Sequence, residues 1–565
     1  MSPTDPFSES IMTGVIPDTD EVPPNPVEST DSDKTVAYPS GFVEARVRAT
    51  QHIYHSIASL DTSQVDCRVL ILPRQPYNFD IPGAEWATLH PIGAHTEPIL
   101  DIRCLAVREA AEYTSWLIPG PLQCELYFGP YEDSVGVVNK SNLPLHITPL
   151  PSALSSDVQR NNGITIHAYS TGTLGTGAWV FGDESLSWAF QAQIFPRRHV
   201  LEVIGLSARP TATRKRDATE QELFVRPHVE HFAVAKSIEC LSGMNNGEVA
   251  YFHALGGADE KTKGPDLTFS RIRQVGETKS AVVFQAQHSD FAKQVIVIKA
   301  FKKNSGYDII TRGQNWEREI KAHSGLQSDH IAKLLGGDGR IHALYIEKID
   351  GKDLCCWCNF RADRKFRGTI ANAQCILHDM ARALKYLRGQ NILHNDIKPS
   401  NIIFNGTKAV LIDFGHATRD ESGICTGGTP WYVPPEYLHS KERKAPSDVW
   451  ALGIVMLYVL RRISLPDAGL DVPCWQLGEL WSVGSTANAQ MEKWLKIVAD
   501  EANKMAVRGG GLESVVSRMV SSLPRERITA SELVSAVEAL VLHRTEQTGP
   551  ETSKAKRARG KLSYT

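Results

Sequence analysis

The chain reads His394-Asn395-Asp396-Ile397-Lys398-Pro399-Ser400-Asn401 and, further on, Asp413-Phe414-Gly415. The first stretch supplies a carboxylate, a lysine two residues later and a side-chain amide, and the second adds another carboxylate. Phosphoryl transfer needs a group that orients the attacking hydroxyl, a cation beside the phosphate and oxygen ligands for a divalent metal. The two stretches therefore point to a phosphoryl-transfer site.

Length and composition indicate more than one folded domain. The chain has 565 residues, 42% of them hydrophobic, and a formal net charge of −3. One core rarely serves so long a chain, and this charge does not favour nucleic acid as a partner. The start, Met1 to Asp5, lacks a secretory signal, and the most apolar run, Val449 to Leu460, is shorter than the ~20 residues of a membrane span. We expect an intracellular protein, in the cytoplasm or nucleus, without a membrane span.

The amino-acid composition of the N-terminal part divides it into two segments. Residues 1–41 are acidic and proline-rich, which predicts a disordered tail. Residues 42–210 contain short runs of β-forming residues separated by Gly, Pro and Asn, which predicts an all-β, sandwich-like domain. These runs are Val69 to Leu72, Leu100 to Val107, Cys124 to Phe128, Val135 to Val138, Ile164 to Ala168, Ala178 to Phe181, Trp188 to Phe195 and Val200 to Ile204.

Residues 133–141 within this segment loosely resemble the strand and turn texture of forkhead-associated domains, which bind phosphothreonine. The Ser-x-x-His pair of that family is not found after a Gly-Arg strand, so phosphate binding is not expected. We favour an interaction or structural sandwich, which would bind a regulatory partner, over a phosphopeptide reader.

Two further segments flank the remaining domain. Residues 211–265 carry a basic cluster and end in Gly, Lys and Pro, which predicts a linker with some local structure. Residues 546–565 are polar and basic. They fit a nuclear-import signal and a solvated disordered end equally well.

Residues 266–545 resemble the eukaryotic protein kinase family, whose landmarks occur here in the correct order. The resemblance covers about half of the chain. It implies an α+β fold with two lobes, a β-rich N-lobe and a helical C-lobe, that binds ATP with Mg²⁺ or Mn²⁺.

The resemblance assigns several residues to nucleotide binding. The glycine-rich hairpin over the phosphates corresponds to Val275, Gly276, Thr278, Ala281 and Val283, and only the first of its three glycines is present. Losing two glycines is expected to reshape nucleotide binding without forbidding it.

Lys299 ends an apolar strand and would hold the phosphates. Its partner would be Glu319, on a helix expected from Trp316 to His323, with Glu317 as the competing choice. Backbone groups near Glu347 and Ile349 would bind the adenine edge, with Ile346 behind the pocket.

The opening stretch supplies the catalytic residues implied by the resemblance. Asp396 would orient the substrate hydroxyl, and Lys398 would neutralise charge on the transferred group. Asn401 and Asp413 would be the metal ligands. Lysine at this spacing is typical of serine/threonine kinases rather than tyrosine kinases.

Asn395 occupies the position where most protein kinases carry arginine, which makes this a non-RD sequence. A short neutral amide cannot form the bidentate bonds that arginine makes to an activation-loop phosphate. We therefore expect that loop phosphorylation is not obligatory. Among the loop hydroxyls Ser422, Thr426 and Thr429, we expect Thr429 to hydrogen-bond Asp396 and Lys398.

Later residues bear on the class of substrate. Glu436 and Asp448 match the Pro-Glu and Asp-x-Trp segments that form a protein-substrate platform in the family and that small-molecule kinases lack. Arg527 is spaced to pair with Glu436, as in the family. The cysteines at 355, 356 and 358 lack the paired spacing of a metal site, so we place them on a helix.

The sequence thus predicts a serine/threonine protein kinase that transfers the γ-phosphate of Mg-ATP to protein substrates. The alternative is a pseudokinase that acts as an ATP-binding scaffold, suggested by Thr278, Ala281 and Asn395. Retention of Lys299 and of the base and metal residues argues against it.

Overall fold

The computed structural model describes residues 56–547 with internal gaps. The gaps are residues 63–64, 74–80, 82–83, 92–101, 120–121, 151–162, 184–187, 210–229, 255–265, 304–307, 420–426, 442, 483 and 509. The predicted acidic tail, almost all of the predicted basic tail, and Ser422 and Thr426 lie outside the described residues.

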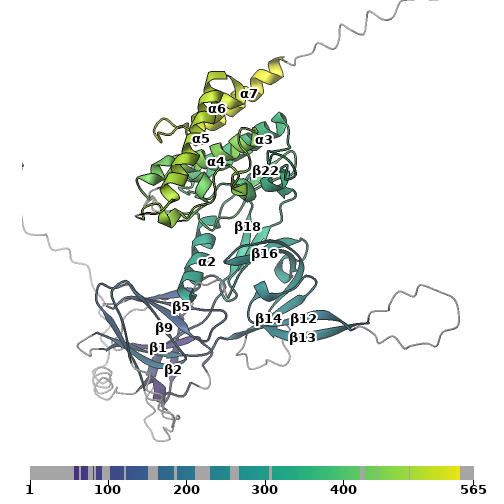
Figure 1. The fold of residues 1–565 in the computed structure, drawn as a ribbon. Coiled ribbons are helices and arrows are strands. Elements are labelled where there is room, and N and C mark those ends of the chain that lie inside the picture. Colours follow the sequence, from purple (N-terminus) through teal and green to yellow (C-terminus); the bar gives the residue numbers. More distant parts are fainter. Residues whose placement is uncertain are drawn as a thin grey trace, which may run out of the picture. The chain divides into compact units, whose positions relative to one another are not determined.

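The β-rich N-terminal region contains two antiparallel sheets (Figure 1). The strand order of the first is β2-β3-β1-β11-β10-β7-β8, and that of the second is β4-β5-β6-β9. The strands are β1 (Val69–Pro73), β2 (Ala84–Leu89), β3 (Ile102–Val107), β4 (Ser115–Ile118), β5 (Cys124–Phe128), β6 (Val135–Asn139), β7 (Leu145–Pro149), β8 (Ile164–Ile166), β9 (Thr171–Leu174), β10 (Gly177–Gly182) and β11 (Trp188–Ile194).

Apolar residues from both sheets form one buried cluster, which includes Ile71 of β1, Trp116 of β4 and Phe181 of β10. Strand β6 is buried along its whole length. Val135 and Val137 belong to this cluster, whereas Val138 packs with Ile309 and Ile310 of helix α2 (Ile309–His323). An uninterrupted apolar run is what a strand covered on both faces requires.

The second region is built around an eight-stranded antiparallel sheet in the order β13-β12-β14-β15-β16-β17-β19-β18. Its strands are β12 (His199–Arg209), β13 (Glu230–Ile238), β14 (Val249–Ala254), β15 (Leu267–Glu277), β16 (Ala281–His288), β17 (Ile296–Phe301), β18 (Leu334–Asp338) and β19 (Ala343–Glu347).

Three of these strands differ from the sequence prediction. The run Val200 to Ile204 was assigned to the sandwich but lies in β12, which pairs with β13 and β14. Strands β13 and β14 fall in the predicted linker, and β14 pairs with β15. The Gly, Lys and Pro residues that suggested a linker flank these strands rather than interrupt them.

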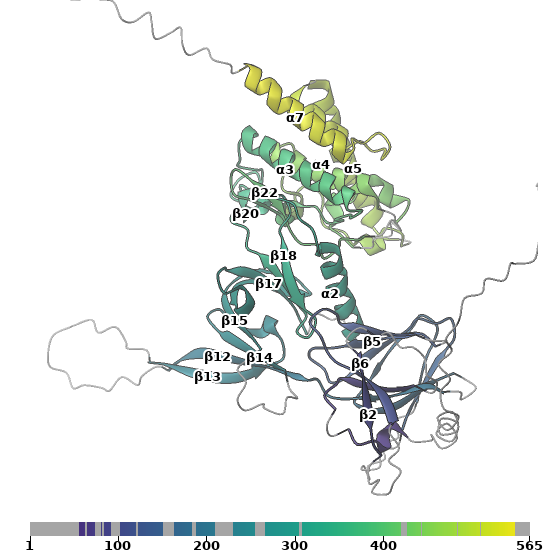
Figure 2. The same cartoon turned by 180° about the vertical axis from the view of Figure 1, so that it is seen from behind.

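The C-terminal lobe is helical, and α3 packs against both α4 and α7 (Figures 1 and 2). Its helices are α3 (Ile370–Gly389), α4 (Ala445–Val459), α5 (Ala487–Arg508), α6 (Gly511–Met519) and α7 (Ala530–Gln547). Helix α4 is apolar on all sides because it is buried on all sides. A small sheet of β20 (Lys352–Asp353), β21 (Ile402–Phe404) and β22 (Ala409–Leu411) lies beside α3.

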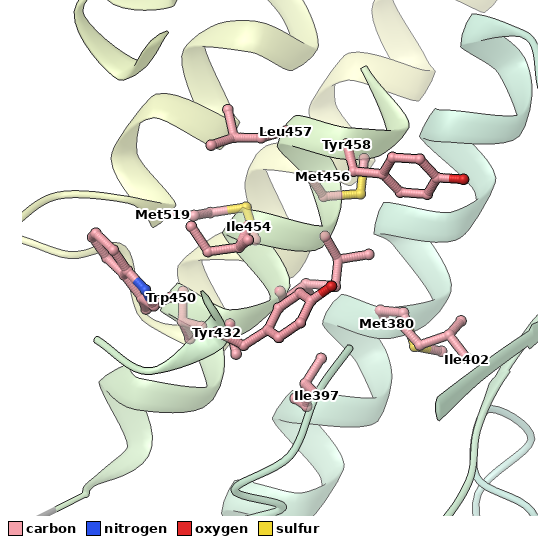
Figure 3. Packing of buried hydrophobic residues seen from close by; sticks show 14 of the residues in the cluster. Met380, Ile397, Ile402, Tyr432, Trp450, Ile454, Met456, Leu457, Tyr458 and Met519 are labelled. Carbon is pink, nitrogen blue, oxygen red and sulfur yellow. The ribbon is translucent and has the colours of Figure 1, made fainter. Parts of the chain in front are cut away.

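This lobe buries the apolar residues of the stretch that contains Asp396. Ile397 and Ile402 are almost fully buried in the large cluster of the lobe, together with Met380 of α3 and Ile454 of α4 (Figure 3). Among the described residues, the helices are too short or too polar to cross a membrane.

Candidate active site

Lys299, Glu319 and Asp413 form the centre of the site. Lys299 comes from β17, Glu319 from α2, and Asp413 follows β22. The Lys299 Nζ atom lies 2.8 and 2.7 Å from the two Glu319 carboxylate oxygens and 2.7 Å from Asp413 Oδ1. The predicted partner Glu319 is therefore the observed one, and α2 begins seven residues earlier than expected, with Asp308 as its N-cap.

The charges of this centre are strongly coupled. Burial alone would lower the pKa of Lys299, but Asp413 and Glu319 outweigh it and hold that pKa above its usual value. Burial would likewise raise the pKa of Asp413, but the charge and hydrogen bond of Lys299 hold it well below its usual range. Lys299 is thus a fixed cation and Asp413 a fixed anion at neutral pH.

The backbone of the catalytic stretch is held by Asp448 of α4. Its carboxylate accepts hydrogen bonds from the His394 and Asn395 amides at 2.8 and 2.9 Å. Asn395 and Asp413 have φ angles of 63° and 67°, a left-handed conformation that asparagine and aspartate tolerate better than most residues. Such conformations persist where surrounding contacts enforce them.

Asp396, Lys398 and Thr429 form a hydrogen-bonded triangle. Lys398 Nζ lies 2.8 Å from Asp396 Oδ2 and donates to Thr429 Oγ1 at 2.9 Å. The Thr429 hydroxyl donates to Asp396 Oδ1 at 2.8 Å. The expected role of Thr429 as a partner of both residues is therefore what the structure shows.

Asn401 and Asp413 provide oxygen donors suited to Mg²⁺. The Asn401 Nδ2 atom donates to the Asp396 backbone oxygen at 2.8 Å and to Asp396 Oδ2 at 3.2 Å. This fixes the amide so that its oxygen is the acceptor left for a ligand. Mg²⁺ takes one or two protein carboxylate or carbonyl oxygens and completes its shell with phosphates and water, which this donor set fits.

The hairpin between β15 and β16 contains Val275, Gly276, Thr278, Ala281 and Val283. Gly276 pairs with Val283 across the two strands. The Thr278 amide donates to the Ala281 carbonyl at 2.8 Å, and the Ala281 amide donates to Thr278 Oγ1 at 3.0 Å. The threonine at a glycine position therefore closes the turn with its own side chain.

The end of β19 and the residues that follow it are the segment expected to form the hinge. The Glu347 amide donates to the Lys333 carbonyl at 2.9 Å, and its carboxylate accepts from the Lys333 amide at 2.6 Å. Ile346 and Ile349 are half-buried. The cysteines that follow lie in and after a short 3₁₀ helix, Leu354–Trp357, with Cys358 in the large hydrophobic cluster. No group of three metal-ligating His, Cys, Asp or Glu residues occurs in the described part of the chain.

A residue that sequence reasoning missed, Arg443, braces the loop around Asn395. Its guanidinium donates to the Asn395 and Gly427 carbonyls, both at 2.6 Å. The Asn395 side chain donates to the His416 carbonyl and to Thr418 Oγ1, both at 3.1 Å. The sequence offers little sign of this role, because Arg443 stands in a charged stretch that reads as solvent-exposed and yet is 3% exposed.

Glu436 and Arg527 form a bidentate ion pair, with Arg527 Nη1 and Nη2 at 2.9 and 3.0 Å from the carboxylate oxygens. Two parallel charged hydrogen bonds fix both orientation and distance. The pair therefore ties the segment after the catalytic site to the loop before α7.

The chain is similar to known protein kinases. Residues 269–537 match the family model of the protein kinase domain. Serine/threonine-protein kinase PLK4 of Drosophila yakuba is 29% identical over 280 residues, which are 48% of this chain and 32% of that protein. Aurora kinase of Yarrowia lipolytica is 32% identical over 151 residues, or 25% of this chain and 39% of the relative. Aurora kinase of Eremothecium gossypii is 31% identical over 198 residues, or 33% and 51%.

The matched segments thus span between about a third and about half of the length of these relatives. The residues matched by the family model include Lys299, Asp396 and Asp413. Residues 269–537 are thus similar in sequence to the protein kinase domain.

Proposed function

We propose that this chain is a serine/threonine protein kinase that transfers the γ-phosphate of ATP to protein substrates. The observation that carries the proposal is the position of Lys299, 2.7 Å from both Glu319 and Asp413. A lysine held by a helix glutamate beside a metal-binding aspartate is the arrangement required for phosphoryl transfer by protein kinases. A scaffold without activity would not require it.

Each residue of the site has its own role in the transfer of phosphate. Asp396 accepts the hydrogen bond of the substrate hydroxyl and aligns it, while Lys398, 2.8 Å away, neutralises charge on the transferred group. Lys299 holds the phosphates, and the hairpin from Val275 to Val283 and the hinge at Glu347 and Ile349 position the nucleotide. Asn401 and Asp413 would hold Mg²⁺, which would supply positive charge to stabilise the phosphates.

Regulation and location follow the same proposal. The Asn395 side chain bonds the start of the activation loop directly, at His416 and Thr418, which supports activity without loop phosphorylation. We place the kinase inside the cell, with protein substrates and a regulatory partner for its β-rich region. That region is proposed as a sandwich related loosely to forkhead-associated domains, without phosphate binding.

The test is transfer of labelled γ-phosphate to a generic protein substrate with Mg²⁺ or Mn²⁺. Wild type is compared with Asp413→Ala and with Asp500→Ala, whose carboxylate is exposed on α5. We expect transfer by wild type and Asp500→Ala and none by Asp413→Ala. Equal transfer by all three proteins would refute the proposal.

A further inference from the structure

Helix α2, which carries Glu319, packs against the β-rich N-terminal region. Tyr127 of β5 and Val138 of β6 form a buried cluster with Ile309 and Ile310 in the first turn of α2. This contact brings an element outside the matched kinase domain onto the helix that completes the Lys299 ion pair.

The two surfaces approach closely enough to require glycine. A Cβ atom at Gly136 of β6 would lie 2.5 Å from Ile310 Cγ1 and 2.7 Å from Ile309 Cγ2. A Cβ atom at Gly313 of α2 would lie 2.7 Å from Tyr127 Cδ1. All three distances are shorter than carbon atoms tolerate, so the fit between strand and helix is specific.

Polar contacts fix the rotation of the helix. Thr114 and Ser115 donate their hydroxyls to Glu317 Oε1 at 2.7 and 2.8 Å. Glu317 and Glu319 are two residues apart and therefore point about 200° away from each other around the helix. One carboxylate is held by the β-rich region, and the other faces Lys299.

The β-rich region also contacts the strand of Lys299. The Tyr131 hydroxyl donates to the Phe301 carbonyl of β17 at 2.8 Å, and its neighbour Glu132 lies 2.6 Å from Arg312 of α2. The Arg312 guanidinium in turn lies over the Tyr131 ring. Both elements that carry the Lys299–Glu319 pair are thus bonded to the same segment.

We propose that the β-rich region acts in cis as a positioning element for α2, with Thr114, Ser115 and Glu317 as its positioning residues. It holds α2 in the rotation and position that keep Glu319 on Lys299. This rests on the proposed function, because the pair matters for turnover only if the chain transfers phosphate. A purely structural role would make the contact important for stability alone.

The experiment uses the full chain and two pairs of variants. Thr114→Val removes the hydroxyl with little change of shape, and Thr114→Ser retains it. Gly136→Ala places a methyl group against α2. Gly172→Ala is its control, because it places a methyl group within the β-rich region, where a Cβ atom would lie 2.7 Å from Ile166 Cδ1. Thermal unfolding shows that all four variants are folded before they are compared.

Two readouts are then taken: amide hydrogen exchange of α2 and steady-state kinetics. We expect Thr114→Val to accelerate exchange in α2 and to lower kcat by about tenfold, because it loses a hydrogen bond to a charged group. Gly136→Ala should change exchange and kcat in the same direction, because its methyl group displaces Ile309 and Ile310 of α2. The KM for the protein substrate should stay within about twofold, because the proposed role of the Lys299–Glu319 pair is to hold the nucleotide phosphates rather than that substrate. Thr114→Ser and Gly172→Ala should behave as wild type.

Unchanged hydrogen exchange of α2 in both Thr114→Val and Gly136→Ala would overturn the inference. An equal decrease of kcat in Gly136→Ala and Gly172→Ala would overturn it as well. Absence of phosphate transfer in wild type would instead refute the proposed function. The exchange measurement would still decide whether the β-rich region holds α2.

Discussion

Replacement of Lys299 by methionine should destabilise the kinase domain as well as abolish phosphate transfer. The substitution leaves the Glu319 and Asp413 carboxylates without the cation that lies 2.7 Å from each. Removal of one partner of a buried ion pair costs about 3–5 kcal/mol, because the other charge stays buried.

The magnitude follows from the exposure of the two carboxylates. The Glu319 side chain is 2% exposed, whereas that of Asp413 is 35% exposed and is partly screened by water. We therefore expect a loss of about 2–3 kcal/mol at neutral pH. In a domain of this size the loss lowers Tm by about 4–12 °C.

The loss should depend on pH in a defined direction. In wild type the pKa of Asp413 is depressed, so Asp413 contributes stability above its unfolded pKa and loses it as the pH falls. Burial already raises the pKa of Glu319, and without Lys299 the pKa values of both carboxyls should lie above their unfolded values. The folded variant then binds protons more readily than its unfolded chain. The stability difference between wild type and variant should therefore become smaller as the pH falls from about 7 to about 5.

The assay is thermal unfolding of the full chain at the two pH values, combined with phosphate transfer. Lys293→Met is the matched control, because Lys293 is exposed in the turn before β17. A Lys299→Met protein with the wild-type Tm at pH 7 would refute the reasoning. A deficit that is the same at both pH values would refute it as well.

Three further outcomes follow from the site. Thr426→Ala should retain most phosphate transfer, because Asn395 cannot form the arginine bonds to a loop phosphate; an inactive Thr426→Ala protein would contradict this. Thr429→Val should lower kcat by about tenfold, because it removes the hydroxyl between Asp396 and Lys398. Thr429→Ser retains that hydroxyl and should keep most of the wild-type kcat. Equal decreases of kcat in the two variants, measured by steady-state kinetics, would show that the hydroxyl is irrelevant. Chelation of the divalent metal should abolish transfer, and added Mg²⁺ should restore it; transfer that continues in excess chelator would exclude the role of Asn401 and Asp413.

The resemblance of residues 269–537 to protein kinases could be predicted because the residues that carry it lie in short linear motifs, and the family comparison agrees with it. One loop and one hairpin fix the spacing of Asp396, Lys398, Asn401 and Asp413. The order of these residues in the sequence therefore specifies their arrangement. The preference for Glu319 over Glu317 was also correct. Glu317 faces Thr114 and Ser115 instead.

What the sequence did not predict depends on contacts between distant segments. Strands β12 to β14 extend the sheet that carries Lys299, although β12 was predicted to belong to the sandwich and β13 and β14 to a linker. The burial of Arg443 and the packing of Gly136 on α2 arise from residues far apart in the chain. Local patterns of hydrophobicity cannot specify such pairings.

The most direct test of the central claim is phosphoamino-acid analysis of a protein substrate labelled by the full chain with Mg²⁺ and γ-labelled ATP. Wild type and Asp396→Asn are compared at equal concentration. We predict label on serine or threonine with wild type and none with Asp396→Asn. Equal label with both proteins, or label on tyrosine alone, would contradict the account.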